Sequence, residues 1–292
     1  MQLRWITDDD YPRRLLQCED APLLLYYKGS VDLNPKHCIS IVGTRNATAY
    51  GRKIGDELVK TLSHLAGTQI ISGLAYGIDI HAHRLALKHH IPTIGILGHG
   101  FDQLYPAAHK STAEEMIEHG GLITEFSSQT KLDRTNFPTR NRIIAGLSDV
   151  TVVIEAAKKG GALITAEIAN SYNRDVCAFP GAIDQTYSAG CNYLIKTHRA
   201  HLIQNGEDLI QLMGWAQRPR PGGGKQLNLL PPQLRPDEKM IHQFLEDKKQ
   251  AGIDEIALQL NWPMSKLAST LLEMEINEYI IALPGKQYKN LL

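Results

Sequence analysis

Short apolar runs alternate with helix-like segments along most of the chain. The runs are rich in β-branched residues, and several, such as 150–154, place apolar residues on both faces, as a central parallel strand requires. The predicted strands are 38–42, 69–72, 93–97, 121–125, 150–154, 176–179 and 200–203. Between them lie segments of about 10–15 residues with helical periodicity, for example 51–65 and 162–172. This alternation predicts an α/β fold with a Rossmann-like, doubly wound and mainly parallel sheet.

The pattern changes on both sides of this core, which we place at residues 37–215. Residues 1–36 form an N-terminal extension with one short predicted strand within 21–29, and we expect the extension to pack on the core. Residues 216–235 are rich in proline and glycine and lack periodicity, so we predict a linker there. The last segment, 236–292, contains three predicted helices and a hairpin, at 237–248, 253–260, 264–274 and 279–288. This order predicts a winged helix-turn-helix domain.

Charge and composition narrow the possible functions. The 292 residues carry 31 Lys and Arg against 31 Asp and Glu, which excludes a uniformly basic nucleic-acid coat but allows a local basic groove. No apolar run approaches the roughly 20 residues that span a bilayer, and the polar N-terminus does not resemble a signal peptide. We therefore expect a cytoplasmic protein without a membrane partner. Its four cysteines are far apart and form no CxxC pair, which favours reduced thiols over disulfides or a zinc site.

The predicted winged helix is acidic. Residues 236–292 carry six Lys and Arg against nine Asp and Glu, a net charge of −3, whereas the preceding residues carry 25 against 22. Neutralisation of phosphates dominates the non-specific affinity of proteins for duplex DNA, so we expect this domain to contact protein or to serve a structural role. The alternative is a transcription factor that uses its winged helix and prefers duplex DNA to single strands.

Glycine-containing loops follow the predicted strands, at the edge of the sheet where ligands of such folds bind. The first loop contains Gly43, Thr44 and Arg45, and the second contains Gly73 and Gly77. Glycine lets a backbone approach a ligand closely, helix N-termini bind anions, and a guanidinium suits phosphate. The alternative is that Gly43 only makes a tight turn and that Arg45 is an ordinary surface residue.

The same loops argue against a dinucleotide cofactor and against a metal. The chain has no G-x-G-x-x-G motif, and Ser72 and Gly73 stand where an NAD ribose would need an acidic residue. His81 and His83 are two residues apart on a predicted helix, so they point to different faces. Asp79 is predicted to cap that helix.

A basic loop before residue 143 gives the strongest signal. Arg134, Arg140 and Arg142 lie within nine residues that contain no acid. We place Arg140 and Arg142 in the first turn of a helix, where the helix dipole disfavours cations, so their presence indicates a bound anion. A solvated basic loop is the alternative.

These loops are expected to converge at one end of the sheet. The predicted basic groove contains Arg45, Lys110, Arg140, Arg142 and the backbone N–H groups of Gly160 and Gly161. Tyr105 lies in the third loop, and we expect it to pack there rather than to stack on a base. Glu155 and Glu167 both have helix-terminal explanations, so no catalytic residue is predicted. Cations and backbone donors without a reactive group are typical of sequence-independent binding to a single strand.

At these loops the chain resembles the DNA-processing protein A family, DprA/Smf. The matching segments are IVGTR at 41–45, SGLAYGID at 72–79, YP at 105–106, FPTRNRIIAGLS at 137–148, FPG at 179–181 and GCNYLI at 190–195. The resemblance implies a Rossmann-like core that binds single-stranded DNA without cleaving it, forms a homodimer, loads RecA recombinase and serves natural transformation. Carried onto this chain, it implies a phosphate path along Gly43, Arg45, Lys110, Arg140 and Arg142, with Asn141 orienting the loop. His109 stands where the family usually has asparagine.

A second, partial resemblance keeps an enzymatic function open. Arg140, Gly160, Gly161 and Glu167 are similar in order to the glycine-rich site of LOG-like phosphoribohydrolases, which cleave nucleoside monophosphates. The chain lacks their Pro-Gly-Gly-x-Gly-Thr core, and Ile168 replaces their second glutamate. We therefore hold this reaction as the alternative function.

Overall fold

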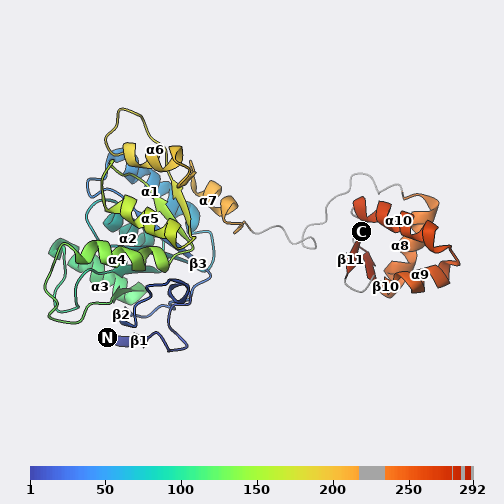
Figure 1. Ribbon diagram of the computed structural model, residues 1–292, viewed down its shortest axis with the longest axis horizontal. Coiled ribbons are helices and arrows are strands. Elements are labelled where there is room, and N and C mark those ends of the chain that lie inside the picture. Colours follow the sequence, from blue (N-terminus) through green and yellow to red (C-terminus); the bar gives the residue numbers. More distant parts are fainter. Residues whose placement is uncertain (217–233, 278, 284–286, 291–292) are drawn as a thin grey trace. The chain divides into compact units, whose positions relative to one another are not determined.

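The structure, a computed structural model, describes residues 1–216, 234–277, 279–283 and 287–290 (Figure 1). The chain forms two compact units, Met1–Gln217 and Arg218–Leu292. The predicted linker falls mostly on residues 217–233, which lie outside the described ranges.

A nine-stranded sheet is the centre of the larger unit. Its strand order is β1-β2-β6-β5-β4-β3-β7-β8-β9. The strands are β1 (Gln2–Trp5), β2 (Leu24–Gly29), β3 (His37–Val42), β4 (Thr68–Ser72), β5 (Thr93–Ile96), β6 (Gly120–Thr124), β7 (Val150–Val153), β8 (Asp175–Ala178) and β9 (His201–Leu202). Strands β3 to β9 pair in parallel, whereas β1 and β2 join one edge antiparallel. The predicted Rossmann-like, mainly parallel sheet is confirmed.

The apolar runs explain why β3 occupies the middle of the sheet. All six of its residues are buried. Because side chains alternate along a strand, Ile39 and Ile41 enter one hydrophobic cluster, while Cys38 and Val42 enter another on the opposite face. A strand that is buried on both faces in this way needs helices on both sides of the sheet.

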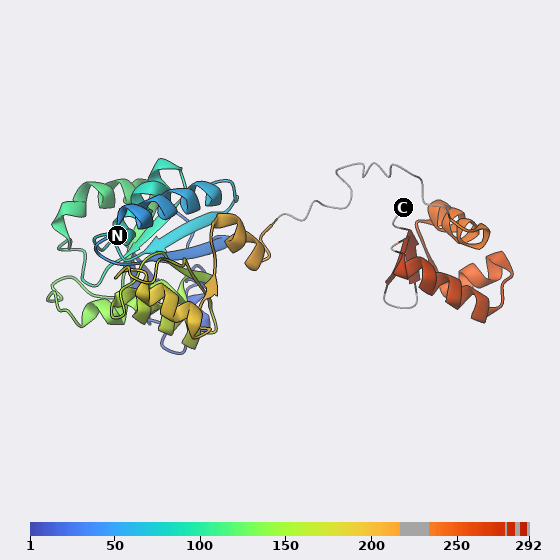
Figure 2. The same ribbon diagram turned by 90° about the horizontal axis from the view of Figure 1, so that it is seen from above.

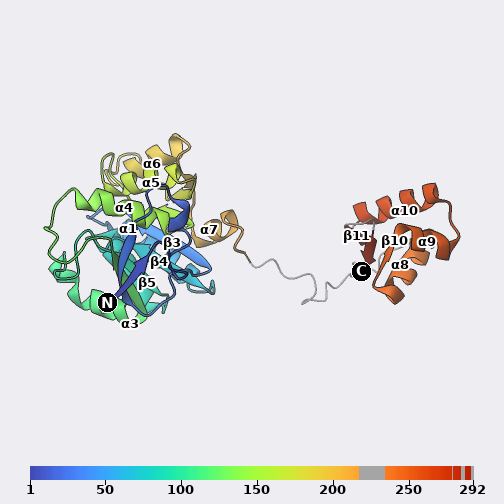
Figure 3. The same ribbon diagram turned by 60° about the horizontal axis from the view of Figure 1, so that its bottom comes forward.

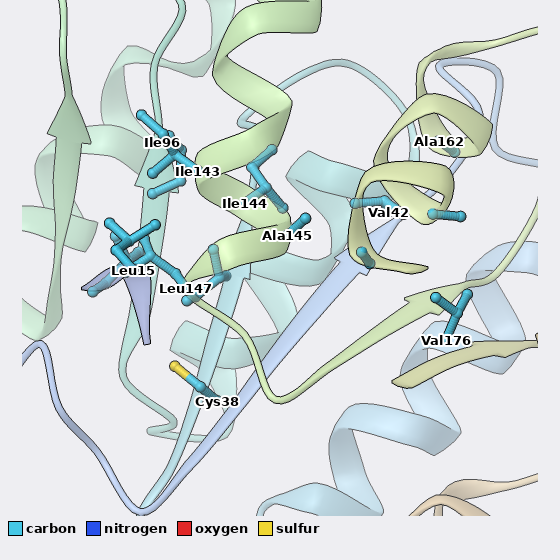
Figure 4. Packing of buried hydrophobic residues seen from close by; sticks show 14 of the residues in the cluster. Leu15, Cys38, Val42, Ile96, Ile143, Ile144, Ala145, Leu147, Ala162 and Val176 are labelled. Carbon is cyan, nitrogen blue, oxygen red and sulfur yellow. The ribbon is translucent and has the colours of Figure 1, made fainter. Parts of the chain in front are cut away.

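Two groups of helices supply this cover, as Figures 2 and 3 show. One face carries α4 (Asn136–Gly146), α5 (Gly161–Ser171) and α6 (Ala189–Lys196), and the other carries α1 (Ala49–Leu62), α2 (Ile78–Lys88), α3 (Lys110–His119) and α7 (Gly206–Leu212). Short 3₁₀ turns occupy Leu15–Gln17 and Ala107–His109. Leu15 of the N-terminal extension is buried in one cluster with Ile143 of α4 and with Leu147, which follows the helix (Figure 4). The extension therefore packs against the α4 face.

The second unit is a winged helix, as predicted. Its helices and strands are α8 (Pro236–Lys248), α9 (Ile253–Leu260), α10 (Met264–Ile276), β10 (Gln250–Gly252), β11 (Ile280–Leu283) and β12 (Gln287–Asn290). The three strands form a sheet in the order β10-β12-β11. The buried side chains of Ile241, Leu245, Ile256 and Leu267 form its core. No helix in the described part of the chain has both the length and the apolarity needed to cross a bilayer.

Candidate nucleic-acid interface

The loop between β3 and α1 lies at the point where the strand order of the sheet reverses. β3 pairs with β4 on one side and with β7 on the other, and ligands of doubly wound sheets bind at such a position. Thr48 ends the loop and caps α1, because its Oγ1 accepts a hydrogen bond from the Gly51 backbone N–H at 3.2 Å. Arg45 lies on this loop and is exposed. Its guanidinium carbon lies 6.0 Å from the centre of the Phe137 ring.

Arg45 belongs to a small pocket at the carboxyl ends of the strands, which we call the Arg45 pocket. Its lining residues are Arg45, Gly73, Ala75, Tyr76, Tyr105, Pro106, Phe137 and Arg140. Tyr76 and Tyr105 are 46% and 42% exposed, so both rings offer surface to a ligand. Tyr105 also packs on Phe137, with the ring centres 5.8 Å apart, so the expected packing and an exposed aromatic surface occur together. An exposed arginine with no ion pair to a described carboxylate, among aromatic rings, suits a polynucleotide, because phosphates attract the cation and bases stack on the rings.

Arg140 lies in the same pocket but is 4% exposed. One of its terminal nitrogens, Nη1, donates hydrogen bonds to the carbonyl oxygen of Gly73, at 2.7 Å, and to that of Ile96. Burial lowers the pKa of Arg140 to about 10, against the opposing effect of Asp79. The guanidinium therefore remains cationic at neutral pH, and it ties the loop after β4 and the last residue of β5 to α4.

Asp79 faces Arg140 from the first turn of α2, so the prediction that it caps this helix is wrong. The N-cap position is Gly77, and no side chain caps the helix there. Asp79 is 7% exposed. Burial raises the pKa of its carboxyl above the ordinary value, while the Arg140 guanidinium and hydrogen bonds from the Ala75 and Gly73 backbone lower it. The carboxylate thus belongs to the buried charge system beneath the pocket.

Arg142 points elsewhere. Its guanidinium donates to the Asp20 carbonyl oxygen at 2.6 Å and to the Glu125 carboxylate, and its side chain is 18% exposed. α4 begins at Asn136, so neither Arg140 nor Arg142 lies in its first turn. The inference of a bound anion from the helix dipole was therefore wrong. Arg142 joins the N-terminal extension to the end of β6.

The remaining predicted groups lie around the Arg45 pocket without lining it. Lys110 begins α3 with its side chain 74% exposed, 3.9 Å from the Glu114 carboxylate. Gly160 and Gly161 are exposed at the start of α5. Asn141 connects this helix to the pocket, because its side chain accepts from Arg140 Nε at 3.2 Å and its Nδ2 donates to the Gly161 carbonyl at 3.4 Å.

The glycines of the first two loops serve contacts within the protein. Gly77 has φ of +79°, and a Cβ there would lie 2.1 Å from the Thr44 carbonyl oxygen. A Cβ on Gly73 would lie 2.7 Å from both Arg140 Nη2 and Asp79 Oδ2. Gly43 likewise lies against Ile78. These positions need glycine so that neighbouring loops can approach one another.

Among the lining residues that were missing from the predicted groove are two aromatic ones, Tyr76 and Phe137. Both lie in loops that the sequence had singled out, and an aromatic residue beside glycine or arginine was the available signal. In the described part of the chain, no three His, Cys, Asp or Glu side chains come together as a metal site would require.

Comparison with known proteins identifies the family. Residues 2–214 match the family described as DNA recombination-mediator protein A, and residues 226–286 match the DprA winged helix domain. The chain belongs to the DNA recombination-mediator protein A family. The predicted resemblance to DprA/Smf is confirmed.

Individual relatives cover most of the chain. Protein Smf from Synechocystis sp. is 34% identical over 317 residues, which span 97% of this chain and 78% of that protein. The X-ray structure of DNA processing protein A from Streptococcus pneumoniae has 38% sequence identity, covers 72% of this chain and 73% of that chain, and gives a TM-score of 0.68. A structure of DNA processing protein A from Helicobacter pylori, described as giving insight into its single-stranded DNA binding mode, has 26% identity, covers 74% and 97%, and gives a TM-score of 0.66.

The two candidate carboxylates, Glu167 of the alternative enzymatic function and Glu155, both lie outside the Arg45 pocket. The Glu167 carboxylate, on α5, accepts a hydrogen bond from Arg199 and is partly exposed. Glu155 is buried and accepts hydrogen bonds from Thr48. A phosphoribohydrolase would need a carboxylate beside the bound ribose. In this DNA recombination-mediator protein, the arrangement of these two residues gives that reaction no support.

Proposed function

We propose that the protein binds single-stranded DNA independently of base sequence through the Arg45 pocket. The observation that carries this proposal is the exposed Arg45 among Tyr76, Tyr105 and Phe137, at the carboxyl edge of the sheet. In the described part of the chain no carboxylate lies within ion-pair distance of Arg45, so its charge is available to a phosphate. The single-stranded DNA binding described for the similar Helicobacter pylori protein supports the same ligand class.

The proposed role of this binding is to protect incoming single strands and to deliver them to RecA recombinase during natural transformation. Membership of the recombination-mediator family supports a place in DNA recombination. We further propose that the protein acts as a cytoplasmic homodimer, because two linked grooves on one strand raise the overall affinity without a new contact. Neither a cofactor nor a catalytic residue is part of the proposal.

A titration of an oligo-dT strand by fluorescence anisotropy at 50 mM and 200 mM salt tests the binding site. Arg45→Ala is expected to weaken binding about tenfold and to reduce the slope of log K against log salt by about 0.7, the contribution of one phosphate contact on a single strand. The matched control is Arg13→Ala, which removes an exposed arginine from the N-terminal extension. Its neighbour Arg14 pairs with Asp149, which directly precedes β7. Arg13 therefore lies towards the amino ends of the parallel strands, whereas the Arg45 pocket lies at their carboxyl ends.

Equal affinities and equal salt slopes for Arg45→Ala and Arg13→Ala would overturn the proposal that the Arg45 pocket binds the strand. Delivery to the recombinase is measured separately, as the lag before RecA hydrolyses ATP on strands coated with single-strand binding protein. The wild-type protein is expected to shorten this lag. An unchanged lag with intact strand binding would contradict the recombinase role alone.

A further inference from the structure

A second cavity, which we call the Glu155 cavity, lies beyond the carboxyl ends of β3, β7 and β8. Its lining residues are Thr48, Tyr50, Glu155, Gly181, Ala182, Gln185, Tyr187 and Ser188, none of which lines the Arg45 pocket. Its volume is about 320 Å³, within the range of about 300–1,000 Å³ that is usual for pockets of small ligands. The strand order reverses between β3 and β7 at this point, where ligands of this fold class bind.

The β3–α1 loop contributes a residue to each of the two sites. Arg45 lines the Arg45 pocket, and Thr48, three residues further along the same loop, lines the Glu155 cavity. Three residues span at most about 11 Å even when fully extended. This length corresponds to about three nucleotides at the 3.4 Å rise of a stacked strand. A strand held at Arg45 can therefore reach the Glu155 cavity with a nearby nucleotide.

The aromatic side chains of the cavity are held by contacts within the protein. The Tyr50 hydroxyl donates to the Pro180 carbonyl oxygen. The Tyr187 hydroxyl accepts from Asn46 Nδ2 at 3.0 Å, and the Tyr187 carbonyl accepts from the Ala156 N–H at 2.7 Å. With the hydroxyls held, the two rings contribute aromatic surface to the cavity. A flat ring can bind to this surface without the cost of first ordering the side chains.

The charge of the lining suits a base and not a phosphate. Glu155 is the one acidic or basic side chain among the lining residues, and it is 3% exposed. Its carboxylate accepts hydrogen bonds from Thr48 Oγ1 at 2.6 Å and from Thr48 N at 3.0 Å, so it is already engaged at the start of α1. A negative charge in the wall repels a phosphate. Stacking on aromatic rings needs no charge and tolerates every base.

We propose that the Glu155 cavity binds a nucleobase ring of the bound strand, stacked on the rings of Tyr50 and Tyr187, while the phosphates of that nucleotide stay outside. The inference rests on the proposed function, which supplies the strand. It adds a site that holds a base through aromatic surface, whereas Arg45 attracts a phosphate. A free nucleoside carries the same ring, and the experiment separates the two sources.

The experiment measures, by fluorescence anisotropy with the full chain, the affinity for oligo-dT and for an oligomer of equal length whose sugars carry no bases. Ala182→Phe places a ring in the cavity from an exposed loop position. It should weaken the binding of oligo-dT at least about fivefold, the lower end of what stacking of one base provides. The salt slope should stay unchanged, because no phosphate contact is lost. The affinity for the oligomer without bases should change less than about twofold, because this oligomer has no ring to place in the cavity.

Two control variants separate the loss of the cavity from other effects. Ile183→Phe is the matched control for Ala182→Phe, because Ile183 is 96% exposed and does not line the cavity, and it should bind both oligomers as the wild type does. Tyr187→Leu removes a ring and should weaken the binding of oligo-dT alone, whereas Tyr187→Phe keeps the ring and should keep the affinity. Thermal unfolding of every variant is measured, and the two Tyr187 variants decide the test if Ala182→Phe does not fold.

A calorimetric titration with thymidine identifies the source of the ring. Weaker binding of oligo-dT in Ala182→Phe, with no binding of thymidine to the wild type, supports the proposal with the strand as the source. Binding of thymidine that Ala182→Phe abolishes, with an unchanged affinity for oligo-dT, supports the binding of a base ring and makes a free nucleoside its source.

Three results overturn the proposal. In the first, Ala182→Phe and Tyr187→Leu leave both the affinity for oligo-dT and the thymidine titration unchanged. In the second, they weaken the binding of oligo-dT and of the oligomer without bases equally, and in the third they reduce the salt slope as Arg45→Ala does. Failure of the proposed function looks different, because Arg45→Ala would then leave the affinity for oligo-dT unchanged, while the thymidine titration would still test the cavity.

Discussion

Replacement of Arg140 by methionine tests whether this arginine holds the loops together or contacts a ligand. The wild-type side chain is 4% exposed, donates to the Gly73 and Ile96 carbonyl oxygens, and faces the buried Asp79 carboxylate. Arg140→Met keeps the apolar stem and leaves these acceptors without their cation. Removal of one partner from a buried charge pair costs about 3–5 kcal/mol. In a domain of this size the melting temperature should fall by about 6–20 °C.

The pH dependence of this loss has a defined sign. In the wild type, burial raises the pKa of Asp79 and Arg140 opposes the rise. Without the guanidinium, the pKa of the folded carboxyl rises further above its unfolded value, so the folded state holds a proton that the unfolded state releases. The stability deficit of Arg140→Met is therefore largest above this raised pKa and shrinks as the pH falls through it. Urea unfolding at pH 8 and pH 5 measures the difference.

A double-mutant cycle with Asp79→Asn separates the charge interaction from the loss of packing. The double variant is expected to be less destabilised than the sum of the single variants, because no unpaired carboxylate remains. One outcome would refute this reasoning. The free energy of unfolding of Arg140→Met would lie within about 1 kcal/mol of the wild-type value at both pH values, while its affinity for oligo-dT disappeared. Arg140 would then act on the ligand, and its buried hydrogen bonds would not matter for the loops.

Two further predictions concern the remaining cations. Arg142→Met is expected to lower the melting temperature and to change the affinity for oligo-dT less than about threefold, because Arg142 already pairs with Glu125. A salt slope reduced as much as in Arg45→Ala would contradict this prediction. Deletion of residues 236–292 should likewise change single-strand affinity less than about threefold, since this segment carries a net charge of −3 and Lys266 of α10 pairs with Asp237 at 2.9 Å. A loss greater than about tenfold in anisotropy would show that the winged helix binds the strand.

The central strands were predictable because a strand that is buried on both faces appears in the sequence as a short run with apolar residues on both faces. Apart from His37 at the start of β3, the residues of β3 and β7 are apolar or small, and each predicted boundary of the parallel strands differs from the observed one by at most one residue. β1 and β10 show no such apolar run and were not predicted. Gln2–Trp5 is a largely exposed edge strand, and Gln250–Gly252 is a three-residue strand defined by its pairing with β12. Pairing of this kind depends on partners that lie far away in the sequence.

The candidate site was harder to predict. The sequence shows which cationic residues are near one another along the chain, but not which face of a helix each of them occupies. The error at Arg140 came from placing the start of α4 too late, which moved the arginine into the first turn. A signal was nevertheless available. Ile143 and Ile144 lie on the buried face of α4, and positions three and four residues before them both fall on Arg140.

An arginine on the buried face of a helix must be neutralised and hydrogen-bonded by the protein itself, because an unpaired buried charge is too costly to keep. Asp79 and two backbone carbonyls meet this requirement for Arg140, which leaves its guanidinium few free donors for a phosphate. The cations that a strand can reach are therefore those away from the buried face. Arg45 and Arg134 are exposed and have no carboxylate partner in the described part of the chain, and Arg134 lies three residues before Phe137. We therefore expect the phosphate path to follow the residues before α4 and the β3–α1 loop, and not the body of α4.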